Sequence, residues 1–185
     1  MARTAILRAA GRLPLLLALA AVAACTSAPA PPSVVVPERL RAPPDQSLAR
    51  TLDAVGVQVY ECRAKAGDAA AAEWVFVAPE ATLRDAHGAP AGRHTAGPTW
   101  EARDGSRITG SVKEKVDAPD AGAIPWLLLA THSIGPRGLF AKVTSVQRVA
   151  TAGGTAPAGG CGAATIGQQA RVPYRAQYVL YEPTF

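Results

Sequence analysis

GRHTAGPTWEARDGSRITGSVKEKV, residues 92–116, shows the clearest β pattern of the sequence. From residue 106 onward, apolar and polar residues alternate with the period of two that is typical of a half-buried strand. The buried face is expected to carry Ile108, Gly110, Val112 and Val116, and the exposed face Arg107, Ser111, Lys113 and Lys115. Asp104-Gly105 stands just before this run and predicts a hairpin with a type I′ turn. The stretch therefore predicts antiparallel β-structure.

Further runs of strand length lie on both sides of this hairpin, separated by Gly, Pro and Asp turn signals. They are residues 55–63, 73–79, 124–130, 139–151 and 172–181. Short strands at regular spacing are typical of sandwiches and barrels. We predict an all-β fold, a single antiparallel β-sandwich or barrel of about 7–9 strands, with at most one or two short helices. One such helix is expected at residues 45–56, with Asp45 as its N-cap and Leu48, Leu52 and Val55 on one stripe.

The N-terminus has the organisation of an export signal. Three arginines, at positions 3, 8 and 12, precede an apolar run from Leu13 to Ala24, and Cys25 follows directly. The run is shorter than the roughly 20 residues that span a bilayer, but it fits a signal-peptide core. Small residues before the cysteine resemble the lipobox of bacterial lipoproteins, which implies cleavage before Cys25 and acylation of its sulfur and amine. The alternative is an ordinary signal peptide with an incidental cysteine.

This organisation predicts three segments: a signal peptide at 1–24, a lipidated Cys25 with a proline-rich tether at 25–44, and one β domain at 45–185. Residues 36–44 of the tether, VPERLRAPP, are an alternative first element on the domain surface. Cleavage removes three arginines and no acid, leaving 16 basic and 14 acidic residues. This balance does not favour nucleic acid as a partner. The expected partner is the lipid bilayer. Thr26, instead of Asp, follows the cysteine, and this resembles the sorting pattern of enterobacterial lipoproteins, which implies the outer membrane, facing the periplasm.

Two cysteines, Cys62 and Cys161, remain once Cys25 carries lipid. An exported protein meets an oxidising compartment, in which these two thiols can pair. Two free buried thiols, or a Cys/His metal site, are the alternatives. The sequence has no C-x-x-C or H-x-x-x-H spacing, which disfavours the metal site.

The segment 92–106 permits both a structural and a functional interpretation. In the structural one, Gly92 supplies an unusual dihedral, Gly97-Pro98 separates two strands, and Trp100 fills the core. In the functional one, His94 acts as a general base or metal ligand, since histidine titrates nearest neutrality. The catalytic candidates are His94, Glu101 and Asp104, and the weak metal candidates are His94 and His132.

Aromatic residues suggest a third interpretation, a binding module whose pocket opens at the mouth of the sheet structure. The ligand-binding candidates are His94, Trp100, Trp126 and Tyr178. Core packing of these aromatics is the alternative.

The block G-x-H-x-x-G-P-T-W-E-x-x-D-G-S at residues 92–106, with GVQVYEC, AIPWLLL and VPYRAQYVLY elsewhere, resembles a domain family of unknown function. The resemblance covers roughly residues 36–183 and implies exported bacterial lipoproteins and secreted fungal proteins. It implies no activity and no cofactor. We therefore predict an exported, lipid-anchored envelope module with a binding or structural role and no cofactor. The alternative is a metal-dependent or hydrolytic enzyme centred on His94 and Glu101.

Overall fold

The computed structural model describes Met1 and residues 34–184. The predicted signal peptide core and Cys25 lie outside the described residues. Residues from Val34 onward form one compact unit, and the description below concerns this unit.

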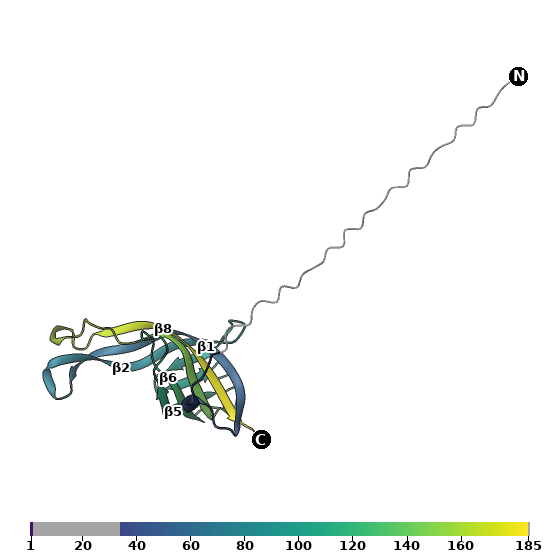
Figure 1. The fold of residues 1–185 in the computed structure, drawn as a ribbon, viewed down its shortest axis with the longest axis horizontal. Helices are drawn as coiled ribbons and strands as arrows, with labels where there is room; N and C mark the ends of the chain where they lie inside the picture. The colour runs from purple at the N-terminus through teal and green to yellow at the C-terminus, as the bar shows by residue number, and fades with distance from the viewer. Residues whose placement is uncertain (2–33, 185) are drawn as a thin grey trace. The chain divides into compact units, whose positions relative to one another are not determined.

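Eight antiparallel strands close into a single barrel (Figure 1). They are β1 (Gln46–Lys65), β2 (Asp68–Arg84), β3 (Pro90–Thr95), β4 (Thr99–Ala102), β5 (Arg107–Val116), β6 (Trp126–Ser133), β7 (Ser145–Gly153) and β8 (Gln169–Pro183). Each strand pairs with the next along the chain, and β8 closes the barrel on β1. The all-β prediction is confirmed, and of its two architectures the chain adopts the barrel.

The barrel interior is filled at one end, which we call the closed end. Strands alternate inward and outward residues, so Leu52, Leu83, Ile108 and Leu180 all point inward and are fully buried there. The segment between β6 and β7 adds Phe140, which is also fully buried. Residues 139–144 were expected to begin a strand, but 139–142 form turns, 143 and 144 have no regular structure, and β7 starts only at Ser145.

The predicted helix at residues 45–56 is wrong, because this segment is the first half of β1. Its backbone pairs with β8 along its length and with β2 from Asp53 onward, so strand pairing satisfies its hydrogen bonds. Side chains follow a period of two: Leu52 and Ala54 are buried, whereas Val55 is 49 % exposed. A helical stripe would have buried Val55 with Leu52.

β5 contains a bulge that reverses the predicted faces at its end. The register steps from Val112 opposite Leu129 to Glu114 opposite Leu128, so one residue is inserted. The remaining residues therefore change sides, and Lys115 points inward while Val116 packs on the outside. A strict alternation from Ile108 predicts the opposite for both residues.

The hairpin predicted at Asp104-Gly105 forms between β4 and β5, but its turn is not type I′. Among the described residues only Ala150 has a positive φ besides glycines, so Asp104 does not. Gly105 has φ +83°, and its amide donates to the Ala102 carbonyl while Ala102 donates to Ser106. This is the pattern of a three-residue loop with a glycine bulge.

Gly92 was expected to supply an unusual dihedral, which it does not: its φ is not among the positive ones. A side chain there would bring Cβ to 2.2 Å from the Glu101 carbonyl oxygen. Close approach of β3 to β4 therefore requires this glycine.

Residues 34–44 pack on the outside of the barrel, and we call them the N-terminal strap. A 3-10 helix, η1 (Glu38–Leu40), places the fully buried Leu40 against Trp126 and Val149. The Gln147 amide donates to the Leu40 carbonyl at 2.5 Å, and Arg39 pairs with Glu114 at 2.9 Å. No helix among the described residues is long and apolar enough to cross a membrane.

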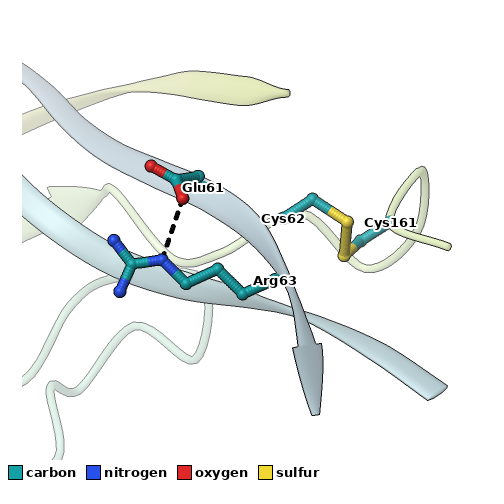
Figure 2. A network of polar contacts seen from close by, with 4 residues as sticks. All are labelled: Glu61, Cys62, Arg63 and Cys161. Carbon is teal, nitrogen blue, oxygen red and sulfur yellow. Dashed lines mark hydrogen bonds and ion pairs between the residues drawn. A yellow bond between two sulfur atoms is a disulfide. The ribbon is translucent and has the colours of Figure 1, made fainter. Parts of the chain in front are cut away.

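At the end of the barrel opposite the closed end, β1, β2 and the start of β8 extend beyond the barrel as a long twisted ribbon (Figure 1). The Cys62–Cys161 disulfide fastens the loop of residues 154–168 to this extension (Figure 2). Backbone bonds between Cys62 and residues 167 and 168, and the Trp74 indole N–H donating to Gly159, complete the attachment. The predicted disulfide is therefore confirmed.

Candidate functional site

A pocket of about 510 Å³ opens into the barrel at the end opposite the closed end, and we call it the barrel pocket. Every strand contributes at least one lining residue. The walls are mainly apolar, and they include Phe76, Val77, Ile124, Pro125, Leu127 and Leu129. The polar lining residues are Gln58, Tyr60, His94, Lys115, Arg148 and Tyr178. No carboxylate lines the pocket in the described part of the chain.

Three aromatic rings form the floor of the pocket. β3 and β4 pair His94 with Trp100, and the two rings stack with centroids 4.4 Å apart. Tyr178 from β8 contacts both rings edge-on, at 5.0 Å from His94 and 5.6 Å from Trp100. The sequence-predicted candidates His94, Trp100 and Tyr178 thus meet in one cluster, and each is at most 2 % exposed.

His94 is held neutral by its surroundings. Burial lowers its pKa to about 3, and the positive charge of Arg148 acts in the same direction, whereas a hydrogen bond to the Thr99 carbonyl raises it. The carbonyl can only accept, so Nδ1 carries the proton and donates across 2.9 Å. Nε2 is then an acceptor. A ring with this pKa is too weak a base for general-base catalysis near neutrality.

Several polar atoms at or beside the pocket floor are buried without a hydrogen bond of ordinary geometry in the described residues. They are the Gln58 Nε2, the Trp100 Nε1 and the hydroxyls of Tyr174 and Tyr178. Burial raises the pKa of both tyrosines, so each hydroxyl keeps its proton. A buried donor without a partner costs about 1–3 kcal/mol, which makes four in one place unusual for a core.

The structure does not bring Glu101 to His94. Adjacent strand residues point to opposite faces, so His94 and Trp100 face inward while Arg93 and Glu101 face outward. Glu101 pairs there with Arg93 at 2.9 Å. A single site that uses both His94 and Glu101 is therefore not formed.

Asp104 stabilises the β4–β5 turn and links it to the segment that fills the closed end. Its carboxylate accepts the Ser106 hydroxyl at 2.6 Å, the Ser106 amide at 2.9 Å and the Leu139 amide at 2.7 Å. These bonds, the one from the Ser106 hydroxyl first, lower the Asp104 pKa. Ser106 in turn accepts the Phe140 amide at 3.0 Å. The Asp-Gly-Ser part of the motif thus holds the segment that carries Phe140.

Two further candidates lie outside the pocket. Trp126 points outward from β6, where it packs beneath Leu40 of the N-terminal strap. His132, near the end of β6, is exposed, whereas His94 is buried. Within residues 34–184 no group of three His, Cys, Asp or Glu side chains is placed to hold a metal ion.

Sequence reasoning missed Gln58, Tyr60, Phe76, Lys115 and Arg148 as pocket residues. Arg148 stands two residues after Val146 on a predicted strand and so shares the face of that apolar residue, which is the one signal that the sequence offers. Which residues share the pocket depends on the strand register, which places Leu127 opposite Arg148 and Arg148 opposite Tyr178.

The fold and the pocket together define a class: up-and-down β-barrels that enclose one cavity. The chain belongs to the DUF3455 family, which is described as a protein family of unknown function, and the match covers residues 43–182. This range contains every barrel strand except the last residue of β8, Pro183, and it confirms the resemblance to a family of unknown function. No curated protein and no solved structure matches the chain.

Proposed function

We propose that this protein binds a small, largely apolar molecule in the barrel pocket, and that it does so in the bacterial cell envelope, anchored by lipid on Cys25. The observation that carries the binding role is the pocket itself: about 510 Å³, with apolar walls and a buried aromatic floor. Ligand pockets typically measure roughly 300–1,000 Å³ and combine apolar walls with a few polar groups. An eight-stranded barrel is just wide enough to hold one such ligand.

Binding is favoured over catalysis by the chemistry of the polar residues. His94 is a weak base, and the other catalytic candidates, Glu101 and Asp104, are engaged outside the pocket. The pocket therefore offers contacts for a ligand without an evident acid–base pair or nucleophile.

The envelope location rests on the N-terminal sequence and on the cysteines. The arginines, the apolar run and the small residues before Cys25 are those of a lipoprotein signal. The Cys62–Cys161 disulfide supports export, because such bonds persist in oxidising compartments. By its resemblance to the sorting pattern of enterobacterial lipoproteins, Thr26 after the cysteine favours the outer membrane, with the barrel in the periplasm.

Mass spectrometry of the protein produced in a bacterium tests the anchor. We expect the N-terminal peptide to begin at Cys25 and to carry three acyl chains, which give stable membrane attachment where one chain is marginal. Replacing the cysteine, Cys25→Ala, is expected to abolish the acylated species. An unmodified Cys25 in the wild-type protein would contradict the anchor and leave the binding role standing.

Fluorescence of the neutral apolar dye N-phenyl-1-naphthylamine tests the pocket. The mature chain, residues 25–185 with Cys25→Ala, avoids detergent, which would compete for an apolar site. We expect saturable binding with enhanced emission. Leu127→Trp fills the pocket wall and is expected to weaken binding about tenfold or more, because the added ring occupies the ligand volume.

Thr82→Trp is the matched control, since Thr82 is exposed on the outer face of β2 and gains the same ring. It is expected to bind the dye as the wild type does. Absence of saturable binding by the wild type, or equal binding by Leu127→Trp, would refute the pocket as the site.

A further inference from the structure

The barrel pocket holds a cation with no carboxylate partner. Arg148 points inward from β7, and its Nε and Nη2 donate to the Pro125 carbonyl at 3.1 and 2.8 Å. None of the five ion pairs among the described residues includes Arg148. Lys115, turned inward by the β5 bulge, adds a second positive charge to the lining. The pocket is therefore positive as well as apolar.

Hydrogen-bonding groups lie in a row beside this cation. Arg148 is close enough to Tyr178 to affect its hydroxyl, Tyr178 neighbours Tyr174, and Tyr174 neighbours Gln58. The hydroxyls of Tyr174 and Tyr178 and the Nε2 of Gln58 nevertheless make no hydrogen bond of ordinary geometry. Trp100 Nε1, which can only donate, is likewise buried without a hydrogen bond. These groups can therefore donate hydrogen bonds to a ligand in the pocket.

This composition selects the chemistry of the ligand. A guanidinium with neighbouring N–H and O–H donors is complementary to an oxyanion, which accepts several charge-assisted hydrogen bonds at once. The apolar walls that extend to the half-exposed Phe76 and Val112 are complementary to hydrocarbon. An alcohol or amide would leave the guanidinium without a counter-charge in a mostly apolar space.

We propose that the ligand is an apolar carboxylic acid whose carboxylate is bound at Arg148 and whose hydrocarbon part lies against the apolar walls. This inference rests on the proposed binding function and specifies its ligand class. Arg148 sets the preference for the acid, and Lys115 adds to the positive potential. Water molecules bound by the same donors are the competing occupants, and they would give the site no preference for an acid.

Displacement of N-phenyl-1-naphthylamine from the mature chain tests this assignment. Decanoic acid and decan-1-ol have the same chain length, and at neutral pH only the acid is charged. We expect decanoate to displace the dye at a concentration at least about tenfold lower than decan-1-ol requires, because a charge-assisted contact strengthens binding by roughly a factor of ten or more. Arg148→Gln is expected to remove this difference while the dye still binds, which also shows that the variant is folded.

Arg175→Gln is the matched control. Arg175 is exposed on β8, next to inward-facing Tyr174, and its replacement changes the net charge by the same amount. The acid preference is expected to persist in this variant. Equal displacement by acid and alcohol in the wild type, or an unchanged preference in Arg148→Gln, would overturn the assignment while leaving the pocket intact. Failure of the dye to bind at all would instead refute the proposed function, and the assignment with it.

Discussion

Replacing both Cys62 and Cys161 by alanine is expected to lower the free energy of unfolding by about 4 kcal/mol. The disulfide joins residues 99 positions apart, so it removes much of the conformational freedom of the unfolded chain. The folded barrel keeps its strand pairing without the bond, so the effect falls mainly on the unfolded state. Denaturant unfolding followed by tryptophan fluorescence measures the change, and reduction of the wild type is expected to reproduce it.

The ion pair beside the disulfide supplies a local control (Figure 2). Arg63 donates to Glu61 at 3.0 Å on the exposed side of β1, and such surface pairs contribute less than about 1 kcal/mol. Arg63→Ala is therefore expected to shift the unfolding midpoint only slightly. A double cysteine variant as stable as the wild type would mean that the backbone bonds of Cys62 to residues 167 and 168 suffice to hold the loop.

Acidification from pH 6.5 to 4.5 is expected to lower the free energy of unfolding by about 2 kcal/mol through His94 alone. The folded pKa is about 3, and the unfolded pKa is the ordinary 6.5. Between these values the unfolded chain binds a proton that the folded chain does not, so stability falls as the pH falls. Above pH 6.5 both states are neutral and the contribution disappears.

Denaturant unfolding at a series of pH values measures this slope. His94→Phe keeps an aromatic ring between Trp100 and Tyr178 and is expected to flatten the slope in this window. His132→Gln, at an exposed position, is the matched control and is expected to retain it. Glu80 and Asp104, whose pKa values are lowered by hydrogen bonds, act mainly at lower pH. An equal slope in wild type and His94→Phe would contradict the assignment.

Local sequence patterns predicted most strands because inward-facing residues are apolar and alternate with outward-facing polar ones along a strand. The alternation that begins at Ile108 in β5 is an example. The helix expected at residues 45–56 failed because its apolar residues fit a period of 3.6 almost as well as a period of two. Pairing with β8, more than a hundred residues away, decided the outcome, and no window of local sequence contains it. The bulge in β5 was not predicted either, because a regular alternation of apolar and polar residues assumes that no residue is inserted.

The candidate site was predicted in part. His94 and Trp100 were found because one motif contains both, and Tyr178 because aromatic residues stand on one face of the last strand. Glu101 and Asp104 lie close to His94 in sequence, but strand alternation and the turn direct them elsewhere. Arg148 and Gln58 come from β7 and β1, and only the closure of the barrel brings them to the same pocket.

With the lipid anchor proposed on Cys25, docking of the N-terminal strap would limit how far the barrel can lie from a bilayer. A free tether from Cys25 to residue 44 would reach roughly 50 Å in extended polyproline geometry. Because Val34 and Val36 already pack against the barrel, only residues 26–33 remain between the proposed lipidated cysteine and the folded body. Fully stretched, that connection spans about 30 Å. Under the proposed anchoring, the barrel would therefore stay close to the membrane and would meet molecules at or just above the leaflet surface.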